Sequence, residues 1–174
     1  MENSKPQVCA EFMDWKVGEN YVVNKFIAEG TYGEVVEAIQ ISPFRLVAIK
    51  RIKHIFSYKS ILHAKRILRE LILLKRLKHP YVIDLLDIIE PEDRYNFDEI
   101  YLVMELADMD LRSVIKSPIK LNNEEVRTLG YKLLCCLNYL HSAKIIHRDI
   151  KPQNILVSNM KNEQTREKKP VGEW

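Results

Sequence analysis

Short apolar runs separated by turn-forming residues open the patterned part of the chain. The first three runs, at 21–27, 34–41 and 46–52, are rich in Val, Ile and aromatic residues, and Gly, Thr, Ser and Pro lie between them. Runs of this kind are typical of an antiparallel meander. Two later runs, at 82–89 and 100–105, are also strand-like, so the pattern predicts five strands in an N-terminal layer.

Helical spacing appears between the third and fourth of these runs. Over 60–77, Ile67, Leu71 and Leu74 recur at i, i+4 and i+7, and the dipeptide His79-Pro80 supplies a stop. The sequence therefore predicts one long helix beside the strands.

The pattern becomes mainly helical after Leu106. A short helix is predicted over 110–115, and a longer one starts at 122–125, where Asn-Asn-Glu-Glu has the form of a capping box. Residues 145–157 indicate a loop followed by a short apolar strand. The apolar stripe of the longer helix consists of Val126, Leu129, Leu133, Leu137 and Leu140.

Length and composition indicate one globular domain. The chain has 174 residues, of which 47% are hydrophobic and 29% charged, and this balance excludes a disordered polymer, a collagen or a coiled-coil rod. Its 27 basic and 24 acidic residues leave a net charge of +3, which is too small to favour nucleic acid or a membrane as partner. We therefore expect neither.

The cysteines and the N-terminal residues indicate the cellular compartment in which the protein would be found. Cys9, Cys135 and Cys136 are odd in number and two of them are adjacent, so they support neither a disulfide framework nor a four-ligand zinc site. The first residues contain no apolar signal region, and no run approaches the roughly 18 apolar residues of a spanning helix. The resulting expectation is a cytoplasmic or nuclear location.

A glycine-rich segment joins the first two predicted strands. The sequence Ala28-Glu29-Gly30-Thr31-Tyr32-Gly33-Glu34-Val35 would lie at a hairpin tip, where small residues allow backbone N–H groups to approach phosphates. A hairpin turn also needs glycine for its own geometry, so a phosphate site and an ordinary turn both remain open. The strand–turn–strand context differs from the strand–turn–helix arrangement of dinucleotide-binding folds.

The third predicted strand carries a small residue beside a long cation. Strand alternation places Ala48 and Lys50 of Val47-Ala48-Ile49-Lys50 on the same face. That face could receive a base and a phosphate. The alternative is an ordinary strand lysine that extends to solvent.

Basic residues dominate the region from Lys50 to Pro80, which has ten Lys or Arg residues and a single acid, Glu70. At about 100° per residue, Glu70 lies roughly 60° from Ile67 on the helix, so its carboxylate emerges on an apolar face and requires a partner. Arg66, four residues earlier, and Lys50 are the two candidates. The basic excess fits a solvated helix face, and it also suits acidic or phosphorylated partners.

The densest cluster of reactive side chains lies between the long helix and the last strand, in His147-Arg148-Asp149-Ile150-Lys151-Pro152-Gln153-Asn154. An acid, a cation and an amide at offsets 0, +2 and +5 offer a proton acceptor, a phosphate contact and a metal ligand to one transfer centre. An ordinary surface loop gives no reason for this grouping. The cluster therefore indicates phosphoryl transfer.

These motifs, in this order, resemble those of the eukaryotic protein kinases: the glycine-rich hairpin, Val-Ala-Ile-Lys, the helix glutamate and His-Arg-Asp-x-Lys-Pro-x-Asn. Four segments look like a mitogen-activated protein kinase, with the cyclin-dependent kinases as the nearest alternative: 14–21, 64–70, 85–89 and 100–106. The resemblance implies an α+β, protein-kinase-like fold. It would have a five-stranded antiparallel N-lobe sheet with a C helix, and a truncated, mainly helical C-lobe.

The resemblance also implies where the domain and its two lobes begin and end. We expect a tail over 1–18, a partial kinase domain over 19–158 and a divergent polar tail over 159–174. Within the domain, the expected parts are an N-lobe at 19–105, a hinge at 105–110 and a partial C-lobe at 111–158.

Matching positions carry the family's roles to individual residues. Lys50 would contact the α- and β-phosphates of ATP and pair with Glu70. Asp149 would accept the substrate proton, Lys151 would steady the γ-phosphate, and Asn154 would bind Mg²⁺. The resemblance places around ATP the residues Ile27, Ala28, Glu29, Gly30, Thr31, Tyr32, Gly33, Val35, Ala48, Lys50, Met104 (gatekeeper), Glu105 and Ala107 (hinge), Asp110 (ribose), Asn154 and Leu156.

Two departures from the family pattern bear on activity. Ala28 stands at the first glycine position, where ordinary β dihedrals would accommodate its methyl group but a positive φ would add about 1 kcal/mol of strain. The Asp-Phe-Gly motif, whose Asp holds the principal Mg²⁺, should fall near residue 167, but the chain has Glu167-Lys168-Lys169 there and no Asp after Asp149. We therefore expect a truncated domain in which the long helix leaves its stripe partly exposed.

The implied function is that of a protein serine/threonine kinase of MAP-kinase type. Such an enzyme transfers phosphate from Mg-ATP to protein hydroxyl groups in intracellular signalling, and its partners are protein substrates and upstream kinases. Without Asp-Phe-Gly, the chain itself should be inactive. The alternative is a non-catalytic fragment that binds kinase partners as a competitor, with association through the exposed apolar C-lobe surface; a pseudokinase is disfavoured because Lys50, Glu70, Asp149 and Asn154 are all present.

Overall fold

The computed structural model describes residues 12–30, 33–56, 61–118 and 120–158. Thr31 and Tyr32 of the predicted nucleotide site, Cys9 and the tail 159–174 lie outside the described residues. The chain divides into two compact units, Met1–Leu106 and Ala107–Trp174.

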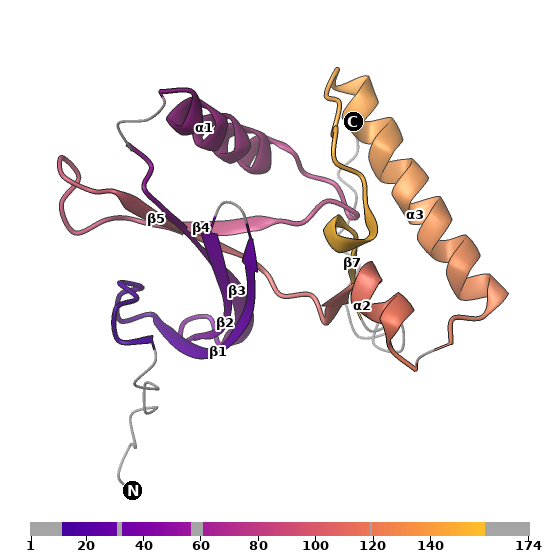
Figure 1. The fold of residues 1–174 in the computed structure, drawn as a ribbon, viewed down its shortest axis with the longest axis horizontal. Coiled ribbons are helices and arrows are strands. Elements are labelled where there is room, and N and C mark those ends of the chain that lie inside the picture. Colours follow the sequence, from indigo (N-terminus) through magenta and orange to yellow (C-terminus); the bar gives the residue numbers. More distant parts are fainter. Residues whose placement is uncertain (1–11, 31–32, 57–60, 119, 159–174) are drawn as a thin grey trace, which may run out of the picture. The chain divides into compact units, whose positions relative to one another are not determined.

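The described residues of unit 1 form a five-stranded antiparallel sheet with one α-helix (Figure 1), as the apolar runs predicted. The strand order is β1-β2-β3-β5-β4. Most strands extend one to three residues beyond the predicted runs, because ladder hydrogen bonds also recruit polar residues at the strand ends. The elements are β1 (Tyr21–Gly30), β2 (Gly33–Gln40), β3 (Arg45–Lys53), α1 (Ile61–Arg76), β4 (Leu85–Ile89) and β5 (Glu99–Glu105).

The fourth strand is shorter than predicted. The apolar run suggested a start at residue 82, but β4 begins at Leu85. The N–H of Val82 donates instead to the carbonyl of His79 at 3.0 Å, which closes a turn after the helix and removes that donor from the sheet. Local turn geometry therefore overrides the apolar pattern at this point.

The two faces of the sheet are covered by different parts of the chain. Alternation on β3 puts Ile49 on one face and Ile52 on the other, and both are almost fully buried. Ile52 belongs to a core cluster with Ile67 of α1, whereas Ile49 belongs to a cluster that includes Phe12 and Val17. The apolar stripe of α1 therefore packs on the Ile52 face, which is the face expected for nucleotide chemistry.

The segment 12–17 is part of the core of unit 1, although the sequence placed it in a tail. Phe12 and Val17 are 6% and 8% exposed. Trp15 packs against their cluster, with its ring centroid 6.3 Å from that of Phe12. Most of the residues that flank Phe12, Trp15 and Val17 are polar, so the sequence shows no regular apolar spacing that would predict this packing.

In its described residues, unit 2 contains two α-helices, one 3₁₀ helix and a small sheet (Figure 1). The short helix begins one residue later than predicted, because Asp110 is its N-cap and accepts a hydrogen bond from the N–H of Ser113. The capping box is confirmed, with Asn122 and Glu125 exchanging side-chain-to-backbone bonds. The elements are β6 (Met109–Asp110), α2 (Leu111–Lys116), α3 (Asn123–Ser142), a 3₁₀ helix η2 (Pro152–Asn154) and β7 (Leu156–Val157), with β6 antiparallel to β7.

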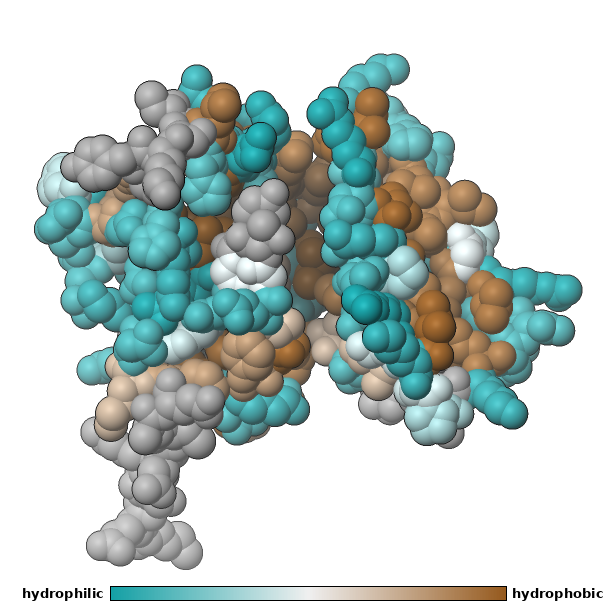
Figure 2. All heavy atoms as spheres, viewed as in Figure 1, coloured by the Kyte–Doolittle hydropathy of each residue, from teal (hydrophilic) through white to brown (hydrophobic). Residues whose placement is uncertain are grey.

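The predicted apolar stripe of α3 is partly exposed. Leu129, Leu133 and Leu137 are half-buried and Val126 is exposed, whereas Leu140 is buried. Figure 2 shows apolar side chains gathered over α3 at the surface. No helix in the described part of the chain is both long and apolar enough to cross a membrane.

Candidate functional site

The glycine-rich hairpin is closed by a tight approach of two strands. Gly30 pairs with Gly33 across the turn, and Gly33 has a φ of +145°, a region that residues with a Cβ rarely adopt. A Cβ on Gly33 would lie 1.8 Å from the main-chain oxygen of Arg51 on β3. Gly33 therefore lets the start of β2 lie directly on β3, and no larger residue fits.

Ala28 fits the hairpin without backbone strain. Among the described non-glycine residues, positive φ angles occur at His54, Lys144 and Arg148, so Ala28 has the ordinary β conformation in which its methyl group costs little. It pairs with Val35 of β2. The neighbouring Ile27 and Glu29 are exposed.

Lys50 is bonded to Glu70, which decides between the two partners that the sequence left open. Lys50 Nζ donates to Glu70 Oε1 at 2.6 Å, from β3 to α1. The two side chains are 20% and 39% exposed. This half-burial strengthens the attraction relative to an exposed pair, so Glu70 holds the ammonium group at a defined place on the sheet.

Three predicted nucleotide residues share the sheet face of Lys50. Directly opposed residues of an antiparallel pair lie on one face, and the register opposes Lys50 to Val35 and Ala48 to Met104. Ala48 is buried, whereas Val35 and Met104 are half-buried. Unit 1 therefore presents a cation beside small and apolar side chains, as phosphate and base binding require; Glu105, the first hinge residue, ends β5 and is exposed.

The second group of candidate residues comes together in unit 2. Lys151 Nζ lies 2.8 Å from Asp149 Oδ2, and Asn154 Nδ2 donates to the same oxygen at 2.8 Å and to the main-chain carbonyl of Asp149 at 2.8 Å. The bond from Lys151 and then that from Asn154 lower the pKa of Asp149 below its ordinary value. The carboxylate is thus ionised, exposed and fixed in direction.

The backbone around Asp149 is shaped by its neighbours. Arg148 has a φ of +67°, an uncommon conformation for a residue with a side chain. The N–H of Asp149 donates to His147 Nδ1 at 3.2 Å. Together they turn the chain so that Asp149, Lys151 and Asn154 converge from six consecutive positions.

Asp110 and Leu156 are also brought together in unit 2. They are partners in the β6–β7 pair, and the N–H of Leu111 donates to the carbonyl of Ile155 at 2.8 Å. Asp110 accepts bonds from the Ser113 N–H at 3.0 Å and hydroxyl at 2.6 Å, and the side-chain bond is the main reason why its pKa is lowered. The predicted ribose residue therefore also caps α2, and Ala107, half-buried, precedes it.

The donor set for a metal ion is small in the part of the chain that the structure describes. No group of three or more His, Cys, Asp or Glu side chains gathers there. Asn154 donates two hydrogen bonds to Asp149 through Nδ2, so its amide oxygen Oδ1 takes no part in them. Oxygen is the ligand that Mg²⁺ prefers. Asn154 thus fits a partial magnesium site.

Two features of the site could not be found from its motifs. The short apolar strand expected at the end of 145–157 is β7, but its pairing with β6 spans two residues in each strand, which is too short to give a period. Arg51 was counted as one of many basic residues, but its side chain is 8% exposed and contacts carboxylates from three parts of unit 1. The sequence did contain one signal for this role. Arg51 directly follows Lys50, and strand alternation places its side chain on the sheet face opposite to that of Lys50.

Comparison with known proteins agrees with the geometry. Residues 21–166 match the model of the protein kinase domain. Mitogen-activated protein kinase 3 of Oryza sativa subsp. japonica is 44% identical over 144 residues, which cover 83% of this chain and 38% of that protein. Mitogen-activated protein kinase 14 of Arabidopsis thaliana is 42% identical over 144 residues, or 83% of this chain and 39% of that protein. A third relative, mitogen-activated protein kinase 9 of Oryza sativa subsp. japonica, is 39% identical over 148 residues, which cover 85% of this chain and 21% of that protein.

The chain thus spans less than two-fifths of the length of these curated relatives. The matched span includes the hairpin, the Lys50–Glu70 pair and the Asp149 loop. The relatives that the chain resembles are mitogen-activated protein kinases, and the chain itself belongs to the protein kinase family.

Proposed function

We propose that this sequence encodes ATP-binding and catalytic elements of a protein serine/threonine kinase, which transfers the γ-phosphoryl group of Mg-ATP to protein hydroxyl groups. The observation that carries the proposal is the loop in which Asp149 is held ionised by Lys151 and Asn154. A carboxylate of this kind is the base that such a transfer needs. Serine or threonine as acceptor is what the resemblance to mitogen-activated protein kinases implies, and the relatives carry that family name.

The elements of unit 1 would bind the nucleotide. Lys50, held by Glu70 at 2.6 Å, presents a fixed positive charge to the α- and β-phosphates. Ala48 and Val35 on the same face leave room for the flat adenine ring, and backbone N–H groups of the hairpin approach the phosphates because Gly30 and Gly33 carry no side chain.

The elements of unit 2 would carry out the proton transfer. Lys151 and Asn154 both contact Oδ2 of Asp149, so Oδ1 is the oxygen that faces a substrate hydroxyl. As the hydroxyl oxygen forms its bond to the γ-phosphorus, its proton passes to Oδ1 and the bond from the γ-phosphorus to the bridging oxygen breaks, releasing ADP. Lys151 offsets the negative charge on the transferred group.

Magnesium, when bound, neutralises charge on the phosphate oxygens. Asn154 would supply one oxygen ligand from this chain. The amide also donates to Asp149, so it orients the base and holds the metal through different atoms.

Mg-ATP binding by the 174-residue chain tests the nucleotide part of the proposal. We expect Lys50→Met to weaken binding at least about tenfold, since it removes the phosphate contact. Lys25→Met is the matched control, because Lys25 is an exposed strand lysine paired with Glu37 at 3.0 Å. Isothermal titration that finds no binding by the unaltered chain, or equal affinities for the two variants, would contradict the proposal.

A phosphate-transfer assay tests the expectation that this polypeptide is inactive on its own. No Asp follows Asp149 in its sequence, so the charge of the Asp that the family uses to hold Mg²⁺ in Asp-Phe-Gly is absent from the 174 residues. We expect no transfer from radiolabelled ATP to a serine- and threonine-containing protein. Transfer that disappears in Asp149→Ala would overturn this expectation.

A second candidate function is that of a binding module that competes with complete kinases. Exposed apolar side chains on α3, including Val126, Tyr131 and Leu134, favour association with another protein surface. Measurement of the chain's mass in solution by light scattering with and without a kinase of this family would distinguish the candidates. Complex formation without phosphate transfer supports the module.

A further inference from the structure

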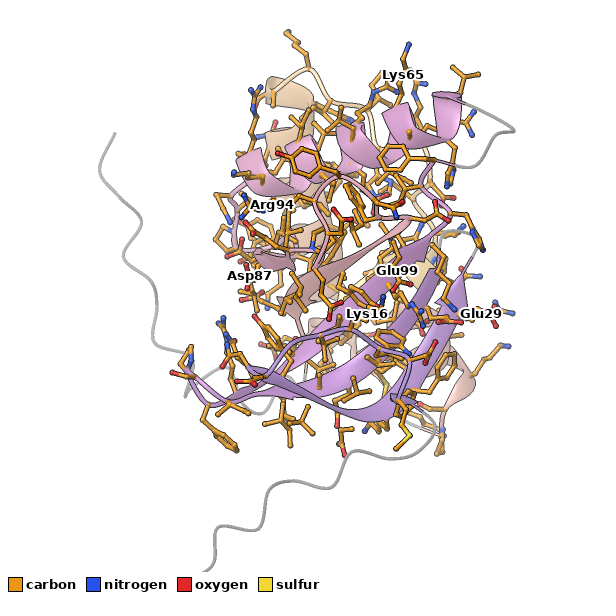
Figure 3. All side chains as sticks on the ribbon, turned by 90° about the vertical axis from the view of Figure 1, so that its left-hand side faces the viewer. Lys16, Glu29, Lys65, Asp87, Arg94 and Glu99 are labelled. Carbon is orange, nitrogen blue, oxygen red and sulfur yellow. The ribbon has the colours of Figure 1, made fainter. Side chains whose placement is uncertain are left out.

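The segment 12–17 lies before the part of the chain that the kinase model matches, yet it is bound to the nucleotide-binding half of the molecule. The matched domain begins at residue 21. Phe12 and Val17 are buried in the sheet core, and the N–H of Lys16 donates to the hydroxyl of Tyr101 at 3.2 Å. Figure 3 labels Lys16 and Glu99 on this side of the sheet, and both line a cavity of about 450 Å³ that reaches Arg51.

Arg51 connects this segment to the sheet. Its guanidinium carbon lies 5.5 Å from the ring centroid of Trp15 and 5.8 Å from that of Tyr101, distances at which a cation is attracted to both aromatic faces. Arg51 Nη1 donates to Asp14 Oδ2 at 2.5 Å and Nη2 lies 2.7 Å from Glu99 Oε2. A buried guanidinium is stable only when it is paired in this way.

The same cation reaches the base of the glycine-rich hairpin. Arg51 Nη1 lies 3.9 Å from Glu34 Oε2, and Lys53 Nζ lies 3.0 Å from Glu34 Oε1. Glu34 pairs with Arg51 in the β2–β3 register and directly follows Gly33. The Glu34 side chain at the start of β2 is therefore hydrogen-bonded by Lys53 and lies within the field of the Arg51 charge, while its backbone is fixed by the close approach at Gly33.

We propose that Asp14, Trp15, Arg51 and Glu34 form a brace through which the N-terminal segment fixes the glycine-rich hairpin and thereby raises the affinity for nucleotide. These are positioning residues, since alternation turns the Arg51 side chain away from the face of Lys50. A hairpin held in place before binding loses less conformational freedom when phosphates bind. The effect on nucleotide affinity rests on the proposed nucleotide-binding function. The existence of the brace does not depend on that function.

The test compares single carboxylate changes in the full chain. Asp14→Asn removes the charge at the segment end of the brace and Glu34→Gln removes it at the hairpin end. Asp14→Glu restores the charge, and Glu90→Gln is the matched control, because Glu90 also pairs with an arginine, Arg94, in an exposed loop. Asp14 and Glu90 are 63% and 71% exposed, so neither change disrupts the core.

Two readouts separate the brace from the nucleotide proposal. Amide hydrogen exchange in the hairpin strands, at 26–30 and 33–36, should be faster in Asp14→Asn and Glu34→Gln, with wild-type rates in Asp14→Glu and Glu90→Gln. The dissociation constant for Mg-ATP should rise about three- to tenfold in the first two variants and stay within about twofold in the others.

Each outcome decides one of the two proposals. Unchanged hairpin exchange in Asp14→Asn, or a change equal to that in Glu90→Gln, overturns the brace. Faster exchange with unchanged Mg-ATP affinity overturns the link to affinity. Failure of the unaltered chain to bind Mg-ATP overturns the nucleotide proposal and the link to affinity, and the exchange rates then still decide whether the brace exists.

Discussion

Removal of the charge at Glu70 should weaken unit 1 measurably, because the pair with Lys50 is half-buried. At the observed 2.6 Å, the attraction between unit charges is about 6 kcal/mol for an effective dielectric constant of about 20. Most of this is offset by the cost of removing both groups from water. In Glu70→Gln the amide oxygen still accepts from Lys50, so the variant exchanges a charge-assisted hydrogen bond for a neutral one, a loss of about 1 kcal/mol.

Thermal unfolding followed by circular dichroism measures this difference. For a chain of this size, about 1 kcal/mol corresponds to a fall in Tm of about 2 to 4 °C. Glu90→Gln breaks an exposed pair with Arg94, in which both side chains are 71% exposed, and such pairs contribute about 0 to 1 kcal/mol. We therefore expect a smaller fall in Tm for Glu90→Gln than for Glu70→Gln.

Ionic strength provides a second check on the same reasoning. Added salt screens the exposed pair more than the half-buried one, so the difference between the two variants should persist at high salt. Equal falls in Tm for Glu70→Gln and Glu90→Gln would refute the assignment of extra stability to the half-buried pair.

Three other changes test the site and the fold. The carboxyl of Asp149 should titrate below its ordinary pKa, in ¹³C NMR, and Lys151→Met should raise that pKa; because the folded pKa is depressed, the stabilising contact is present above the unfolded pKa and is lost as pH falls through the folded one. Ile49→Ala should lower the free energy of unfolding in urea by about 2 to 5 kcal/mol, since Ile49 is fully buried, whereas Phe44→Ala at an exposed position should change it little. Asn122→Ala should cost about 1 kcal/mol in the same urea experiment through loss of the α3 cap.

Features that depend on neighbouring residues were predictable from the sequence. The five strands, α1 and the capping box of α3 follow from apolar spacing and short-range hydrogen bonding, and the structure confirms them. The grouping of Asp149, Lys151 and Asn154 also lies within six residues, so its convergence needs only a local turn. The family resemblance was carried by the same short motifs and is confirmed by the kinase model.

Features that depend on residues far apart were decided by tertiary packing. Glu70 had two candidate partners by spacing, and only the position of α1 on the Ile52 face of the sheet selects Lys50, 20 residues away. The packing of Phe12 and the burial of Arg51 arise because the open sheet face must be covered, and the polar-flanked segment 12–17 covers it with Phe12, Trp15 and Val17. Periodicity reports which face of an element is apolar, whereas the shape of the assembled sheet determines which distant segment covers it.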